Sequence, residues 1–594
     1  MADSPISDKS IYVSFSIKVG GKEIDDTYQV KEIEISKSVN RIPKVEFLIY
    51  DGSASQSDFE ISNTDTFVPG KEIEISAGYE SGSNTLFKGI ITKHELQLRG
   101  GKSFLAVECR DKALKMTTSR KNAFFVKMKD SDILTKLIDD SGLEKDVDAT
   151  AYTHKEVVQY YVSDWDFMLI RAEVNGLLVY VSDGKVSLKK PDFSAAADLK
   201  LTYGIDLIDF NAVMNSEEQL KKVSCYSWDY ANQEVTDEES STATSPGQGN
   251  ITPKKLSDVV ATDEYRLQSS GQVSKEELKS WADSRLMRSA LAAYQCRFKF
   301  QGSEKAVVGS MIEIAGMGDR FNGVAFISSV RHMIREGDWI TEVQTGMGAD
   351  FFSEEVMNIE SPPAAGLTAS VQGFHYGKVK KIDEDPDGET RVLVEMPVME
   401  NDEGIWARLA NLYASNTFGV FFMPEIDDEV LVGFMNDDPS FPVILGSFYS
   451  SKRKPPYTPD AENTYKAIVT KSELKIEFED VKKIITILTP NGNKICFDDD
   501  EGTITIEDEN NNSAIFSENG VAIDSKSDIS LNATGNIDIT AGGNLTMKAT
   551  SNVDISGLQI SSKADTSYTA SGSASAEFSS SGTCTVKGAM VMIN

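Results

Sequence analysis

An eight-residue repeat near the carboxyl end constrains this chain more than any other feature. Apolar residues stand in pairs at positions i and i+2, and the pairs recur every eight residues from Val521 to Ile555. Alternation within a pair is typical of a β-strand, whose side chains point to opposite faces with a period of two. A short, fixed period indicates a stack of repeated strands. The pairs are Val521 and Ile523, Ile529 and Leu531, Ile537 and Ile539, Leu545 and Met547, and Val553 and Ile555.

One repeat is too short to bury its own two apolar side chains. It also lacks room for the three strands and corners of a single-chain β-helix coil. The economical solution is several identical chains wound together, with the apolar pairs meeting on a common axis. Three chains form the smallest closed prism, and closure removes the sheet edges. The sequence therefore predicts a homotrimer with a triple-stranded β-helix over residues 521–594, whose core is the ten paired residues. The alternative is a disordered Ser/Gly/Thr-rich tail, which five in-phase pairs argue against.

The charge of the chain limits the partners that it can bind, and its amino end and its cysteines indicate where it is made. The net charge of -32 argues against nucleic acid or an anionic membrane surface as a partner, because both would repel it. The amino end has neither the basic segment nor the apolar segment of a Sec leader, and no apolar run approaches the ~20 residues that span a bilayer. Five scattered cysteines fit reduced thiols. We expect synthesis in the cytoplasm without a Sec signal.

The first 360 residues are predicted to form a mainly β hub. Strand-like alternation between turn residues places one β-barrel at residues 1–118 and a second at 201–360. An α/β insertion at 119–200 carries two helices, one capped by Asp130 or Ser131 and one by Ser163. Another helix is capped by Ser274. The polar stretch 231–254 has no apolar period and is predicted to be a mobile loop.

Three further segments complete the predicted order of domains. Residues 361–455 contain five or six short strands, with a Pro-Asp-Gly turn in the first hairpin, and suit an OB-fold barrel. Residues 456–520 form a neck of strands, and residues 521–594 form the needle of repeats. The predicted fold class is therefore mainly β and multidomain: hub barrels with a small α/β insertion, an OB-fold, and a β-helix.

The OB-fold segment resembles the corresponding domain of VgrG, the spike protein of type VI secretion systems. VgrG has relatives in contractile phage tails and in extracellular contractile injection particles. Parts of the hub, the neck and the needle resemble the same family, so the likeness covers nearly the whole chain. The matching elements of the OB-fold segment include Gly377-Lys378-Val379, Asp385-Pro386-Asp387-Gly388, Trp406-Ala407-Arg408, Asp428-Glu429-Val430-Leu431-Val432-Gly433 and Pro442-Val443-Ile444-Leu445-Gly446-Ser447.

The resemblance implies a trimeric spike at the end of a contractile apparatus. A hub would match the sixfold inner tube, an Hcp-like protein, and contact baseplate proteins. The needle would touch the target membrane transiently as it pierces the envelope, and firing would deliver it outside the cell or into the target. The resemblance extends to cell-bound secretion systems, released particles and prophage tails alike.

The open end of the needle is the predicted docking site for a partner. Met590, Val591, Met592 and Ile593 stand there without the polar cap that a solenoid's last repeat normally needs. Relatives carry a conical tip protein of the PAAR-repeat class at this place, sometimes with effector cargo. The alternative is that these side chains turn inward and close the prism themselves.

The sequence offers no motif for catalysis, for a cofactor or for a metal. None of the four histidines lies within five residues of another, and no GxSxG, GxxxxGK[ST] or GxGxxG occurs. His332 is expected to be structural. Cys225 or Cys296 remains a bare alternative as a nucleophile, and Asp498 to Gly502 suits a strand turn better than a calcium loop. The open functional alternatives are a spike-borne cell-wall hydrolase and a β-helical fibre or adhesin.

Overall fold

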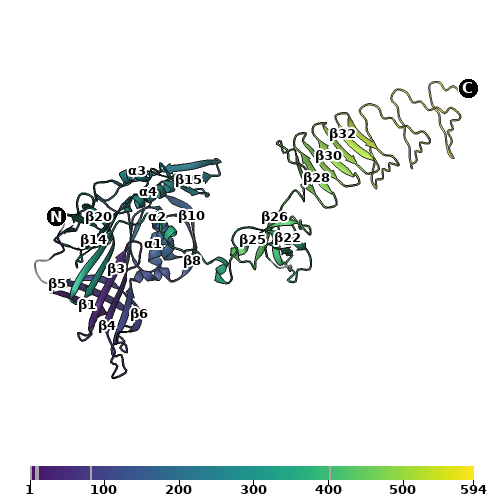
Figure 1. Ribbon diagram of the computed structural model, residues 1–594. Helices are drawn as coiled ribbons and strands as arrows, with labels where there is room; N and C mark the ends of the chain where they lie inside the picture. The colour runs from purple at the N-terminus through teal and green to yellow at the C-terminus, as the bar shows by residue number, and fades with distance from the viewer. Residues whose placement is uncertain (1–2, 7–11, 80–82, 400–402, 594) are drawn as a thin grey trace. The chain divides into compact units, whose positions relative to one another are not determined.

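The computed structural model describes residues 3–6, 12–79, 83–399 and 403–593. The chain divides into two compact units, Met1–Phe448 and Tyr449–Asn594. Both units consist mainly of β-strands, as the sequence predicts (Figure 1). Among the helices in the described part of the chain, none is both long enough and apolar enough to cross a bilayer.

A single thirteen-stranded sheet runs through the hub and joins the two predicted barrels. The junction is the antiparallel pair β3–β20, which aligns Glu32 with Arg335 and Ser38 with Ser329. The two segments predicted as hub barrels are therefore continuous through one sheet, and this pairing between distant segments leaves no sequence signal. The strands are β1 (Val13–Val19), β2 (Lys22–Glu23), β3 (Val30–Ser38), β4 (Lys44–Tyr50), β5 (Glu72–Tyr79), β6 (Asn84–Arg99), β7 (Lys102–Arg110), β13 (Leu199–Thr202), β14 (Leu207–Met214), β18 (Tyr294–Gln301), β19 (Met311–Ala315), β20 (Gly323–Arg335) and β21 (Asp338–Thr345).

Two hydrophobic cores pack against this sheet, one in each half of the hub. In the first half, alternate residues such as Ile33, Ile35 and Phe47 point to one side and are buried there. In the second half, Phe298 and Phe300 anchor the corresponding core. The other side of the same strands carries mostly polar residues, as the period of two requires.

The α/β insertion lies between the two halves of the sheet. Ser163 begins α2 as predicted, because its hydroxyl accepts a hydrogen bond from the Asp166 N–H at 3.0 Å. The predicted strand pair around the Asp183-Gly184 turn is also present. The elements are the 3₁₀ turn η1 (Lys112–Thr117), β8 (Arg120–Lys129), α1 (Asp130–Asp140), β9 (Glu144–Val147), β10 (Thr153–Ser163), α2 (Asp164–Val174), β11 (Leu178–Ser182) and β12 (Lys185–Lys189).

The polar stretch 231–254 is not a loop throughout, which corrects the prediction. Its residues Glu234–Glu239 form β16, an edge strand that pairs with β15 (Val223–Asp229), which in turn pairs with β17 (Tyr265–Ser269). An edge strand is held through backbone hydrogen bonds and can expose acidic side chains, so it shows no apolar period. The helices α3 (Pro253–Val260) and α4 (Lys275–Leu291) follow, and Ser274 caps α4 as predicted.

The OB-fold segment forms a closed five-stranded barrel. Its core contains valines that alternate along the strands, among them Val392, Val394, Val430 and Val432. The predicted Pro-Asp-Gly turn is held by Asp385, whose carboxylate accepts hydrogen bonds from the Arg391 guanidinium. The helix α5 (Phe352–Glu355) and the 3₁₀ turn η2 (Pro363–Gly366) precede the barrel. The barrel strands are β22 (His375–Lys381), β23 (Val392–Glu395), β24 (Ile405–Leu409), β25 (Glu429–Phe434) and β26 (Pro442–Ser447), with the 3₁₀ turn η3 (Met435–Asp437) between the last two.

The second unit begins with a seven-stranded antiparallel meander, here called the neck sheet, in which each strand pairs with the next. It extends to Asp524 and so includes the first apolar pair of the repeat, Val521 and Ile523. Residues 525–593 form neither strand nor helix in the single chain and run back and forth in narrow loops (Figure 1). The strands are β27 (Tyr465–Val469), β28 (Lys475–Glu479), β29 (Ile484–Leu488), β30 (Lys494–Asp498), β31 (Thr503–Glu507), β32 (Ser513–Ser517) and β33 (Gly520–Asp524).

Candidate functional sites

The neck sheet presents two columns of apolar side chains on one face. Each strand from β28 to β33 contributes residues at positions i and i+2, and the antiparallel register aligns them across the sheet. We call this surface the neck face. One column contains Ile476, Ile487, Ile495, Ile506, Ala514 and Ile523, and the other contains Phe478, Ile485, Phe497, Ile504, Phe516 and Val521.

Tight turns keep the columns in register. Each strand has five residues, and turns of four or five residues connect the strands from β27 to β32. Asp508 holds one such turn by accepting hydrogen bonds from the backbone N–H groups of Asn510 and Asn512. Gly492 turns another with a φ of 95°, which favours glycine. The turn at Asp498 is closed by the Glu501 N–H, as expected for a strand connection.

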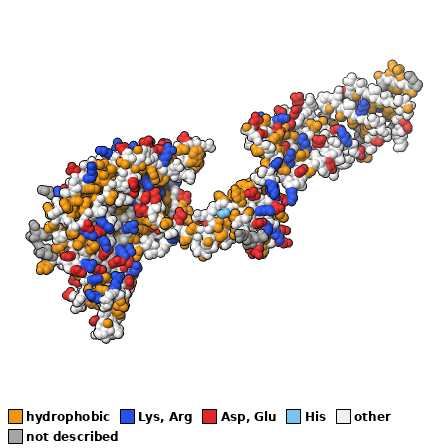
Figure 2. Space-filling view, in the orientation of Figure 1, with side chains coloured by type: hydrophobic (Ala, Val, Ile, Leu, Met, Phe, Trp, Pro, Cys, Tyr) orange, Lys and Arg blue, Asp and Glu red, His pale blue; other side chains and the backbone are white. Residues whose placement is uncertain are grey.

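No described residue of the chain covers the neck face. Its large side chains remain between 37% (Ile495) and 67% (Ile523) exposed, and hydrophobic side chains are visible over this sheet in Figure 2. The opposite face carries many polar residues, such as Lys475, Glu477 and Thr505. A sheet with one apolar face must bury that face against another layer. The neck face is therefore a candidate assembly surface.

Of the five apolar pairs predicted to form the needle core, the first lies in a strand of the single chain. Val521 and Ile523 end the two columns of the neck face, whereas the pairs from Ile529 to Ile555 lie outside any strand. Their exposed fractions run from 54% for Ile537 to 72% for Leu531. Met590, Val591, Met592 and Ile593 are also exposed.

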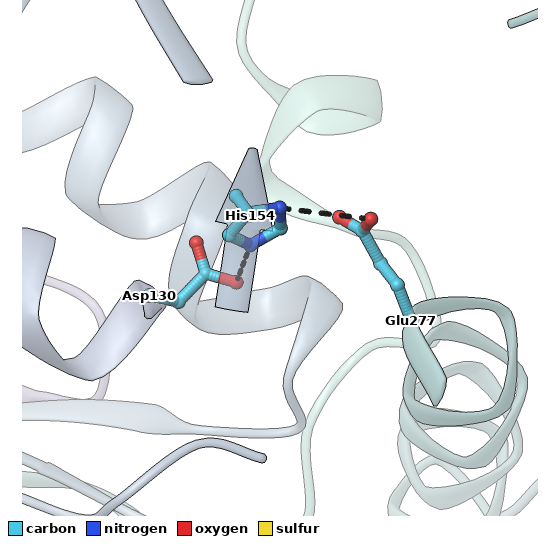
Figure 3. A group of neighbouring side chains, drawn as sticks. All are labelled: Asp130, His154 and Glu277. Atoms are coloured by element: carbon cyan, nitrogen blue, oxygen red, sulfur yellow. Dashed lines mark hydrogen bonds and ion pairs between the residues drawn. The ribbon is translucent and has the colours of Figure 1, made fainter. Parts of the chain in front are cut away.

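A cluster of charged side chains is buried where the α/β insertion meets α4 (Figure 3). Asp130 begins α1, His154 lies on β10, and Glu277 stands in the first turn of α4. The three side chains come close enough to hold a metal ion. His154 Nε2 lies 2.9 Å from Asp130 Oδ2, and His154 Nδ1 lies 3.9 Å from Glu277 Oε2.

Arg171 on α2 supplies the cation of this cluster. Its Nε donates to Asp130 Oδ1 at 2.7 Å, and its Nη2 donates to Asp130 Oδ2 at 2.9 Å and to Glu277 Oε1 at 2.8 Å. The same Nη2 lies 3.1 Å from His154 Nε2. A metal ion would have to displace a guanidinium that already contacts all three residues, so we interpret the cluster as a structural ion pair.

The electrostatics of the cluster agree with that interpretation. Burial would raise the pKa of the Asp130 carboxyl, but hydrogen bonds from His154, Arg171 and Asn175 outweigh it, and the pKa lies below its usual range. Burial would likewise lower the pKa of Arg171, but its contacts with Asp130 and Glu277 raise it. Both groups therefore stay charged. The cluster has no sequence signature, because its members lie on separate elements and form no motif.

The remaining reactive side chains considered from the sequence are buried. Burial raises the pKa of Cys225 to about 12 and also raises that of Cys296, which disfavours the nucleophilic thiolate form. His332 is fully enclosed beside Thr341, and burial lowers its pKa to about 3, so its imidazole is neutral. These groups have the surroundings of structural residues.

Two family models match the chain. The model described as the Alg8 N-terminal domain matches residues 9–336, more than half of the chain. The model described as the type VI secretion system/phage-baseplate injector OB domain matches residues 375–449. The second match begins at the first residue of β22 and ends just beyond β26, so it coincides with the closed barrel.

Two curated relatives with similar sequences are VgrG proteins. The actin cross-linking toxin VgrG1 of Vibrio cholerae is 30% identical over 104 residues, 16% of this chain and 10% of the toxin. The type VI secretion system spike protein VgrG5 of Pseudomonas aeruginosa is 30% identical over 86 residues, 13% of this chain and 11% of that protein. The matches thus span about a tenth of these relatives.

Among solved structures, a type VI secretion system component from Escherichia coli has a TM-score of 0.36 and 14% identity, covering 73% of this chain and 99% of that one. The closed barrel matches the type VI secretion system/phage-baseplate injector OB domain, and short stretches of the chain are similar to VgrG proteins. Because the first family model matches more than half of the chain, the chain belongs to the family of the Alg8 N-terminal domain.

Proposed function

We propose that three copies of this chain assemble through their neck faces and needle repeats into the spike of a contractile injection system. The observation that carries the proposal is the neck face, two aligned columns of isoleucine, phenylalanine and valine with no cover in the single chain. The columns lead directly into the repeat, because Val521 and Ile523 belong to both. One surface therefore runs from the neck into the needle.

Hydrophobic burial would supply the energy for this assembly. Covering the exposed half of a large apolar side chain contributes about 1 kcal/mol, and roughly ten such side chains per neck face would contribute about 10 kcal/mol per chain. Three sheets around one axis enclose these columns and leave no apolar face in water. Closure also removes the free edges that would otherwise pair with further chains.

The role of this trimer is mechanical and non-enzymatic. A prism of intertwined chains cannot be peeled strand by strand without separating the three chains, so it should unfold slowly and withstand load. The hub would sit on the Hcp-like inner tube and contact baseplate proteins. The needle would carry a PAAR-repeat tip protein and, with it, effector cargo, and would pierce the target envelope on firing.

One pull-down experiment tests both ends of the spike. Deleting Gly588–Asn594 should leave a trimer that still retains the inner-tube protein but no longer retains the tip protein, because the exposed apolar residues at the end are gone. A control in which the same segment is replaced by glycine and serine keeps the chain length and should also lose the tip protein. Full retention of the tip protein by either variant would place its docking site elsewhere, and failure of the intact chain to retain the tube protein would contradict the spike role.

A further inference from the structure

A cavity with a volume of about 1100 Å³ lies on the polar side of the hub sheet. Strands of both halves of the sheet, including β3, β7, β18 and β21, form its floor. Residues of α2, α4 and α5 stand over one end. We call this space the hub cavity. It is separate from the neck face and from the needle, and its chemistry does not depend on the spike role.

The charge of the hub cavity is opposite to that of the chain. The chain has 92 acidic and 60 basic residues, but the cavity is lined by six basic side chains and only three acidic ones, Glu108, Glu173 and Glu355. Charges beyond about 10 Å are screened at physiological salt, so the lining determines the potential that a bound group meets. The basic side chains are Arg41, Lys44, Lys93, Arg110, Arg288 and Arg297.

Two of the basic side chains also pair with acids outside the lining, Lys44 with Glu46 and Arg297 with Glu342, but the acids still leave part of the positive charge uncompensated. Glu108 alone faces three cations, with its carboxylate 3.0 Å from both Lys93 Nζ and Arg110 Nε and 3.4 Å from Lys44 Nζ. The guanidinium of Arg41 is exposed and has no hydrogen bond or ion pair with the described residues. This part of the cavity therefore attracts negative charge.

Arg288 is only partly satisfied, because its Nη2 donates to the Asp350 carbonyl and lies 3.9 Å from Glu355 Oε1 while its other two nitrogens lack an acceptor in the described part of the chain. Its side chain is 4% exposed, and its Nε and Nη1 have no hydrogen-bond partner among the described residues. The nearest carboxylate oxygen, Glu173 Oε1, is 3.6 Å from Nη1, while Glu173 Oε2 accepts a hydrogen bond from the Phe352 N–H at 2.6 Å. Burial raises the pKa of Glu173 to about 7, so near neutral pH this carboxyl is only partly charged. Buried donors without acceptors favour a ligand that brings oxygen atoms.

We propose that the hub cavity binds an acidic polypeptide segment of a partner, with carboxylates directed at Arg41 and the neighbouring basic side chains. Hydroxyl and amide groups, among them Ser38, Ser329 and Gln344, line the floor between the charges and can bond to peptide groups. Nucleic acid fits less well. The lining offers only Trp165 and Phe352 as aromatic rings, and stacking on aromatic rings is a main source of single-strand binding.

The test is binding of short labelled probes to the full-length chain, followed by fluorescence anisotropy. An alternating Glu-Ser peptide should bind, and its affinity should fall as salt is raised, because exposed charges are screened. An alternating Lys-Ser peptide and an oligothymidylate should not bind. Binding of the oligothymidylate in place of the acidic peptide, or binding of neither probe, would overturn the proposal.

Substitutions that change the charge inside or outside the hub cavity test whether the Glu-Ser peptide binds there. Arg41→Glu should weaken binding of the Glu-Ser peptide about tenfold and leave folding unchanged, because the Arg41 side chain is exposed and has no hydrogen bond or ion pair with the described residues. Arg41→Lys keeps the charge and should bind within about threefold of the parent chain. Lys22→Glu changes the net charge by the same amount on the exposed strand β2, outside the cavity, and should have no effect. Equal weakening by Arg41→Glu and Lys22→Glu would show that only net charge matters and would overturn the assignment to the cavity.

Discussion

Ile539→Asp is expected to abolish the trimer. Threefold symmetry would bring three aspartate side chains to one level of the axis, each without a hydrogen-bond partner in an apolar core. Burying unpaired carboxylates costs several kcal/mol, so we expect a loss of about 5 kcal/mol or more per trimer, or protonation of the acids. That loss corresponds to a decrease of about a thousandfold or more in the association constant. Trimer yield on size exclusion and the melting temperature of the needle measure it.

The repeat itself supplies the matched control. Asp538 and Asp554 already occupy the middle position of their apolar pairs, so an aspartate there is compatible with the native assembly. Thr546 stands at the same position between Leu545 and Met547. Thr546→Asp should therefore leave the trimer intact, within about 0.5 kcal/mol of the parent chain. If Ile539→Asp leaves the trimer as intact as Thr546→Asp does, Ile539 faces solvent and the axis lies elsewhere.

Arg171→Met should produce the largest loss of stability within the hub. It leaves the buried carboxylate of Asp130 and the partly buried carboxylate of Glu277 close together without the guanidinium that bonds both. Removing one partner of a buried ion pair costs about 3–5 kcal/mol. Because the folded-state pKa of Asp130 is depressed, its contribution is present above an unfolded-state pKa of about 4 and is lost as the pH falls towards the folded value. The thermal transition of the hub at neutral pH measures the effect.

Two further variants separate a buried ion pair from an ordinary surface charge. Lys136→Met removes the exposed pair with Asp140, which lies 2.9 Å away, and should change the free energy of unfolding by no more than about 1 kcal/mol. Adding Asp130→Asn and Glu277→Gln to Arg171→Met removes the stranded charges and should restore much of the loss. If Arg171→Met melts like Lys136→Met, the cluster does not hold the insertion against α4.

Local signals in the sequence predicted the elements whose structure is set locally. Ser163 and Ser274 are followed by acidic residues three positions on, and both begin helices where predicted. The OB-fold strands and most of the neck strands alternate with a period of two and end at turn residues, so they too could be recognised. In these cases, propensity, pattern and capping all favour the same structure.

Features that depend on distant partners could not be predicted. The β3–β20 pair joins segments about three hundred residues apart, and the sequence of neither strand indicates which strand it pairs with. The edge strand β16 is held by its backbone and shows no apolar pattern. The Asp130–Arg171 cluster and the hub cavity arise only when separate elements meet. The neck face could be predicted only in part. Its strands are recognisable from their alternating pattern, but the alignment of its two columns depends on the turns.

Sedimentation equilibrium of the full-length chain, over a range of concentrations, tests the central claim most directly. The proposed assembly predicts a single species with three times the mass of the 65.1 kDa chain. The neck face and the repeat would then be buried between copies, and hydrogen exchange in both should be slow. A stable monomer in which residues 465–555 are nevertheless protected from exchange would contradict the account.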